Sequence, residues 1–195
     1  SGSAALEQEE LESVKDGMGL ASIVSFILVM GLLMIGLRQG WLVISCMITL
    51  IMGLIWTGAF AIAAIGSLNL ISVAFAVLFI GLSVDFGIHY TLRYQEFLLD
   101  ELKASDALVR AVHSVGGALT LTAVGASVAF YSFLPTDYNG LAELGLIAGT
   151  GMFIALIANI TLLPALLVLR PLHVAQKPQI NRYKHNKTAK NALRD

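Results

Sequence analysis

The residue most suggestive of chemistry is an acid, Asp85, which lies well inside an apolar stretch. Its surroundings are apolar or small, in the order Val77-Leu-Phe-Ile-Gly-Leu-Ser-Val-Asp-Phe-Gly-Ile-His-Tyr90. His89 and Arg93 follow at intervals of four residues, which places the three side chains along one face of a helix. A carboxyl group removed from water favours its protonated form, as a proton carrier must. The spacing therefore predicts a proton site at Asp85 and a path from it toward Arg93.

A structural role is the alternative for each of these residues. Asp85 could instead hydrogen-bond a hydroxyl or amide on a neighbouring helix, but an acid within a membrane is by default a functional hypothesis. His89 is the weaker candidate, because a single histidine near an interface more often serves packing. Arg93 is most simply a determinant of topology whose charged end reaches the membrane surface.

Hydrolytic and metal chemistry would need more partners than this pattern offers. Cys46 lies in another apolar run and has the pattern of a small core residue, while Glu143 belongs toward the opposite membrane face. Ser83 lies about 160° around a helix from Asp85, which separates a nucleophile from the acid. We therefore expect no enzyme activity, no metal, no cofactor and no nucleic-acid partner.

The elements that must position Asp85 are long apolar helices. Hydrophobic residues make up 57% of the chain and charged residues 13%, with a mean hydropathy of +0.81. About 20 helical residues cross a bilayer, and the runs of that length are Met18 to Leu37, Trp41 to Ile65, Leu68 to Leu92, about Val115 to Phe133, and Leu141 to Leu169. The sequence predicts an all-α membrane protein with five transmembrane helices spanning 18–169.

Charge outside these runs predicts their orientation. Lys15 is the only cation before the first run, whereas the tail, 170–195, carries seven. Cytoplasmic loops are enriched in Lys and Arg, so we expect the tail to be cytoplasmic and the acidic residues 1–17 to end an extracytoplasmic segment. Residues 93–114 mix charges with apolar residues in a helical rhythm, which predicts an amphipathic connector on the cytoplasmic surface.

Several polar and small residues inside the runs are expected to join helices. The polar ones are Thr120, Thr122, Asn159 and Thr161. Gly145 with Gly149, and Gly36 with Gly40, have the four-residue spacing that lets helix backbones approach closely. Packing is the expected role of all of them.

Three segments of the chain resemble a known family. Gly81 to Tyr94 resembles the fourth transmembrane helix of the RND superfamily, while Gly140 to Gly149 and Leu162 to Leu167 resemble the start and end of its sixth helix. The likeness is strongest to the lipid-exporting MMPL branch, particularly the exporters associated with hopanoid biosynthesis.

This resemblance implies that the five spans are helices two to six of one RND repeat, in a bacterial inner membrane. The first helix, a large periplasmic domain and a second repeat would lie outside this chain. Asp85 matches the family's proton-coupling acid, although many MMPL members continue Asp-Tyr where this chain has Asp85-Phe86.

The implied function is part of a proton-driven exporter of hydrophobic lipids, with hopanoids as a candidate cargo. The same five-helix unit is similar to the sterol-sensing domain, so the alternative is a lipid-binding module without transport activity. The fold alone does not separate these two functions.

Overall fold

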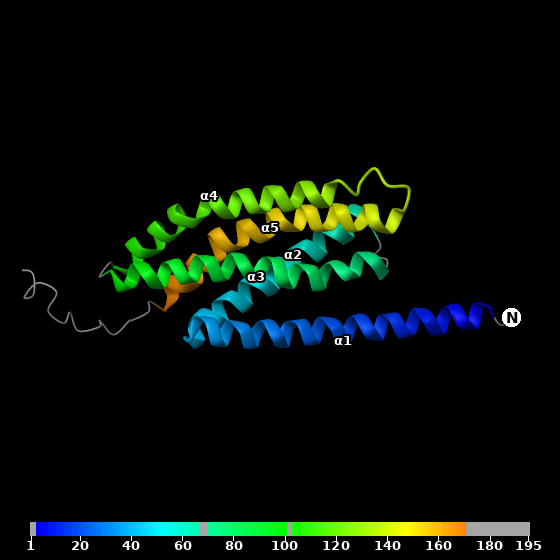
Figure 1. Cartoon of the computed structure of the whole chain (residues 1–195), viewed down its shortest axis with the longest axis horizontal. Helices are drawn as coiled ribbons and strands as arrows, with labels where there is room; N and C mark the ends of the chain where they lie inside the picture. The colour runs from blue at the N-terminus through cyan, green and yellow to red at the C-terminus, as the bar shows by residue number, and fades with distance from the viewer. Residues whose placement is uncertain (1–2, 67–69, 101–102, 171–195) are drawn as a thin grey trace, which may run out of the picture.

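The chain forms a bundle of long helices. The computed structural model describes residues 3–66, 70–100 and 103–170, and the side chains of 19–66, 75–100 and 103–170. Its helices are α1 (Ser3–Leu37), α2 (Gly40–Ile65), α3 (Leu70–Leu99), α4 (Ala104–Tyr131) and α5 (Asn139–Leu169). Each is long and apolar enough to cross a membrane, which confirms the predicted all-α fold with five membrane-spanning helices (Figure 1).

Local backbone geometry explains two of the breaks between helices. Gly66 ends α2 with a φ of 84°, and its N–H bonds to the Ile62 carbonyl at 2.9 Å. This left-handed conformation is favoured by glycine, which has no Cβ to clash. Arg38 adopts a φ of 51° between α1 and α2, where the chain reverses direction.

The boundaries differ from the predicted runs mainly around the connector. The first part of 93–114 continues α3 to Leu99, and the rest belongs to α4, which begins at Ala104. Tyr90 and Tyr94, which lie near the end of the predicted third run, are fully buried, and the Tyr90 hydroxyl donates to the Leu108 carbonyl of α4 at 3.2 Å. Residues of the predicted connector therefore form part of the packing between α3 and α4.

The sequence predicts different surroundings for the two ends of the chain. Residues 1–17 were predicted to end an extracytoplasmic segment, and α1 runs without a break from Ser3 into the first apolar run. The predicted basic tail lies outside the described residues, apart from Arg170.

Among the described residues, α3 packs against all four other helices, whereas α1 contacts only α2 and α3. Figure 1 shows α1 along one side, α4 along the other, and α3 between them. We call the end where α1, α3 and α5 finish and α2 and α4 begin the tail end of the bundle.

One of the two predicted glycine pairs makes a close helix crossing. An added Cβ at Gly145 or Gly149 would come within 3.0 Å of Phe130 or Tyr131 on α4. The other pair does not, since an added Cβ at Gly36 or Gly40 would meet nothing within 4 Å. Sequence spacing therefore identified the close contact between α4 and α5 and overestimated the one near α1.

Candidate functional site

Helix α3 has one exposed stripe despite its central place. The stripe follows the helical repeat through Leu78, Gly81, Asp85, His89, Leu92, Glu96 and Leu99, all exposed. Residues three or four apart share a helix face, so the stripe is one continuous surface of α3 that the other four helices leave uncovered. The predicted site residues Asp85 and His89 both lie on it.

The carboxyl group of Asp85 makes no hydrogen bond or ion pair with any side chain or backbone group in the described part of the chain. The hydroxyl and amide groups that could have held it lie on the opposite side of α3, at Thr91 and on Asn159 of α5. The alternative in which Asp85 joins helices within this unit therefore has no support in the described contacts.

The depth of Asp85 follows from its neighbours. An added Cβ at Gly87 would lie 3.2 Å from both Cys46 of α2 and Asn159 of α5. Cys46 is six residues from the tail end of α2 and Asn159 is ten from that of α5, or about 9 and 15 Å along each helix. Asp85, half a turn farther from the tail end, therefore lies well inside the span, on the tail side of its middle.

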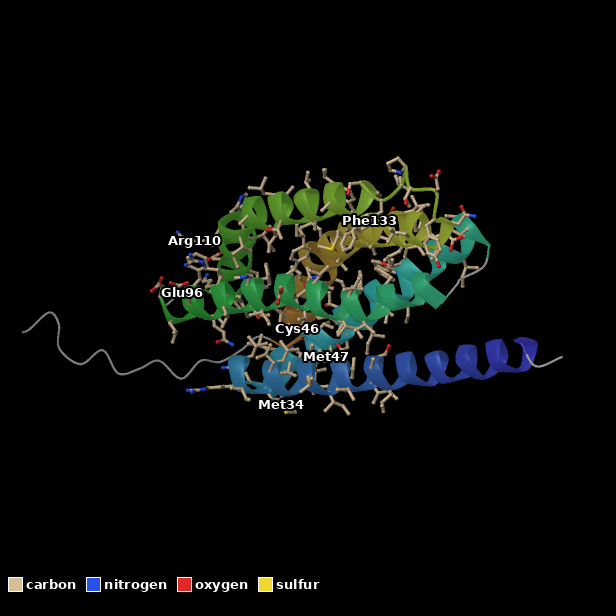
Figure 2. The ribbon with its side chains drawn as sticks, turned by 45° about the vertical axis from the view of Figure 1, so that its right-hand side comes forward. Met34, Cys46, Met47, Glu96, Arg110 and Phe133 are labelled. Atoms are coloured by element: carbon tan, nitrogen blue, oxygen red, sulfur yellow. The ribbon has the colours of Figure 1, made fainter. Side chains whose placement is uncertain are left out.

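His89 and Arg93 continue the line toward the tail end. His89 is exposed, and Arg93 forms an ion pair of 2.6 Å with Glu96, whose side chain is 58% exposed. Figure 2 shows Glu96 on α3 and Arg110 on α4 at this same end. The structure thus brings the three predicted residues onto one side of α3, with Arg93 paired at the surface.

The opposite face of α3 is a buried polar layer formed by Ser83, Gly87 and Thr91. The Thr91 hydroxyl donates to the Gly87 carbonyl at 2.7 Å, and the Cys46 thiol packs beside Gly87. Asn159 is 2% exposed, and its Nδ2 donates to the Ser83 carbonyl at 3.4 Å. Cys46, labelled in Figure 2, is 3% exposed.

Sequence reasoning missed Thr91 in this layer, although the repeat of small residues at 83, 87 and 91 was a usable signal. The predicted separation of Ser83 from Asp85 around the helix is confirmed, because Ser83 is buried on this face while Asp85 is exposed on the other. No group of three metal ligands occurs within the described residues.

The predicted polar packing residues divide into two kinds. Thr120, Thr122 and Thr161 each donate to a carbonyl four residues earlier in their own helix. Asn159 alone of the four reaches another helix. A cross-helix bond that the sequence did not indicate joins the Ser127 hydroxyl to the Gly149 carbonyl at 2.8 Å.

Comparison with known proteins places these features in a family context. A family model described as the MMPL family matches residues 1–188. The hopanoid transporter HpnN of Burkholderia multivorans is 46% identical over 168 residues, covering 86% of this chain and 19% of that protein. The hopanoid transporter HpnN of Rhodopseudomonas palustris is 41% identical with the same coverage.

A more distant relative is also a lipid exporter by name. The sulfolipid-1 exporter MmpL8 of Mycobacterium tuberculosis is 25% identical over 108 residues, which are 55% of this chain and 10% of that protein. The chain therefore spans about one fifth of the length of the hopanoid transporters it matches.

Proposed function

Because this chain belongs to the MMPL family, we propose that it forms part of a proton-driven exporter of hydrophobic lipids, with hopanoids as the candidate cargo. The hopanoid transporters at 46% and 41% identity support this cargo class. In this proposal the five helices are helices two to six of one repeat, and Asp85 takes up and releases the coupling proton. His89 is the secondary candidate on the same path.

The observation that carries the proposal is the exposure of the Asp85 carboxyl well inside a span, without a partner among the described residues. An aspartate facing lipid at the centre of a helix is disfavoured by about 2.5–3.5 kcal/mol. The stripe of α3 therefore needs a cover of protein or water. A second repeat, outside this chain, would supply that cover and the partner of Asp85.

The energy of one proton limits the mechanism. A proton moving down a potential of about 100 mV supplies about 2.3 kcal/mol, whereas each lipid CH₂ group exposed to water costs about 0.8 kcal/mol. One proton cannot drive a bulky lipid bare through water. The proton would instead drive conformational cycling, while apolar surfaces, including a periplasmic domain outside this chain, enclose the cargo.

Cellular placement follows from the same proposal. The chain is part of a multi-pass membrane protein, and we place it in a bacterial inner membrane with its tail in the cytoplasm. The excess of Lys and Arg at the tail end and beyond it supports this orientation. We propose transport and not catalysis as the activity, in keeping with relatives that are named as transporters.

The decisive experiment replaces Asp85 with asparagine, which keeps the shape of the side chain and removes its titration. In the full-length protein, Asp85→Asn should abolish lipid export and the associated proton uptake. Asp137→Asn is the matched control, because Asp137 is an exposed acid in the loop between α4 and α5. Its export should equal that of the unaltered protein.

Two outcomes would count against the proposal. Unchanged export by Asp85→Asn would remove the coupling role of Asp85. Lipid binding that survives in Asp85→Asn, in a protein that shows no export and no dependence on the proton gradient, would instead favour the sterol-sensing-like module.

A further inference from the structure

Three glycine contacts fix how α3 sits among its neighbours. Gly53 of α2 receives the ring of Phe79, and Gly151 of α5 receives the ring of Phe75, each 3.0 Å from where a Cβ would stand. The third contact is reversed, since here the glycine is Gly87 of α3. The side chains that enter its space are Asn159 and Cys46, each 3.2 Å from an added Cβ.

At this third contact, the amide of Asn159 hydrogen-bonds the backbone of α3. Its Nδ2 donates to the Ala155 carbonyl of its own helix at 2.9 Å and to the Ser83 carbonyl of α3 at 3.4 Å. The bond to Ala155 holds the amide group in place on α5. The amide therefore lies on one turn of α3, between Ser83 and Gly87, and Asp85 projects from the other side of this turn.

We propose that Asn159 is a positioning residue that holds α3 in the rotation at which Asp85 faces away from the bundle. This inference rests on the proposed function, because the outward rotation matters if Asp85 exchanges the coupling proton there. Asn159 does not touch Asp85; it acts through the backbone turn that carries it.

Rotation of α3 in either direction would be opposed by side-chain volume. Successive residues are about 100° apart around a helix, so turning α3 by one residue would bring Phe86 or Ile88 to the place of Gly87. Neither side chain fits where even a Cβ is 3.2 Å from its neighbours. A rotation of this size would also carry Asp85 from its exposed position toward α4 or α1.

Few other ionisable groups lie near Asp85 in the described part of the chain. On α3 they are His89 and Tyr90, followed toward the tail end by Tyr94 and the Arg93–Glu96 ion pair, and α2 brings the thiol of Cys46. On α4 and α5 the ionisable side chains toward the helix ends are Asp106, Arg110, Tyr131 and Glu143, with Arg170 following α5. His113 of α4 is exposed and lies five residues beyond the contact of Leu108 with Tyr90, which places it at about the depth of Asp85. Residues 19–37, the part of α1 whose side chains the structure describes, include no ionisable residue, and Arg38 follows at the tail end. A changed pH response in an Asn159 variant that persists in a His113→Gln background would therefore point to Asp85 or His89.

The first test measures lipid export by the full-length protein in membrane vesicles over a series of pH values, per amount of folded protein. Asn159→Leu fills a similar volume but cannot donate to Ser83, and we expect its pH midpoint of export to change by more than about half a unit. Thr161→Ala is the matched control on α5, because Thr161 is exposed and bonds only within its own helix. Its midpoint should be unchanged.

A pair of small variants tests the contact itself. Gly87→Ala should change the midpoint, because the added Cβ would press on Asn159 and Cys46. The combined variant Asn159→Ala, Gly87→Ala relieves the crowding but should keep a changed midpoint, since the amide that donates to Ser83 is also gone. A loss of folded protein without any change of midpoint in all these variants would show that Asn159 is merely structural and overturn the proposal.

A labelling measurement separates this inference from the proposed function. Cysteine introduced at residue 85 should react with a maleimide faster than cysteine at residue 84, because Val84 is 4% exposed and Asp85 is exposed. In the Asn159→Leu background this difference should be lost. A difference that persists there overturns the positioning role, whereas unchanged export by Asp85→Asn refutes proton coupling and leaves the labelling result to decide the rotation.

Discussion

The ring of Tyr131 on α4 lies against the backbone of Gly149 on α5, so close that a Cβ at residue 149 would come within 3.0 Å of it. Two hydrogen bonds accompany this contact. The Ser127 hydroxyl donates to the Gly149 carbonyl at 2.8 Å, and the Tyr131 and Thr150 hydroxyl groups are 3.0 Å apart. The crossing of α4 and α5 therefore depends on glycine at residue 149, which has no side chain, and on hydrogen bonds between the two helices.

Gly149→Ala should lower the stability of the helix bundle. The added methyl group has no room beneath the ring, and such overpacking costs about 1–3 kcal/mol. The measurement is thermal unfolding in detergent. Gly58→Ala is the control, because an added Cβ there would meet nothing within 4 Å; equal melting temperatures for both variants would contradict the close contact.

Tyr90→Phe should destabilise the packing of α3 on α4. The hydroxyl of this fully buried residue donates to the Leu108 carbonyl at 3.2 Å, and losing such a bond costs about 1 kcal/mol. Unfolding in a denaturing detergent measures the change. Tyr138→Phe, at a residue 60% exposed, should have no effect, and a similar response from both would argue against the buried bond.

Asp85→Leu should improve the insertion of the α3 span into a membrane. Leucine is favoured over aspartate at the centre of a span by about 3 kcal/mol in insertion measurements. The fraction of the segment inserted, followed with a glycosylation reporter, measures this change. Val84→Leu exchanges one apolar side chain for another and should leave that fraction unaltered. No gain from Asp85→Leu would mean that residue 85 lies nearer the membrane surface than the neighbouring contacts indicate.

Cys46 should resist modification in the folded protein. It is the only cysteine in the chain, and 3% of it is exposed. A maleimide should therefore react with it only after denaturation, as followed by mass. Ser132→Cys introduces a thiol at an exposed position and should react in the folded state. Rapid labelling of Cys46 itself would contradict its place in the buried layer.

The sequence alone determined the number of helices and the position of the candidate site along the chain. A membrane-spanning helix can be recognised from a local stretch of about 20 apolar residues. In lipid, the backbone N–H and C=O groups of such a stretch must form their hydrogen bonds within the helix itself. Asp85, the one acid well inside such a stretch, was visible for the same reason. The end of α3 and the start of α4 were less predictable, because the sequence there is polar and its helices pack through tertiary contacts such as that of Tyr90 with Leu108.

Only the tertiary structure decided which way Asp85 faces. In our proposal, the exposed position of Asp85 on α3 depends on Asn159 of α5. Asn159 is 76 residues away from Ser83 in the sequence, and its amide donates a hydrogen bond to the Ser83 carbonyl of α3. Hydropathy places a residue at a depth in the membrane, but the rotation of a helix depends on the volumes and hydrogen bonds of its neighbours. The space beside Gly87 admits Asn159 and Cys46, and that packing leaves Asp85 on the outer face of α3.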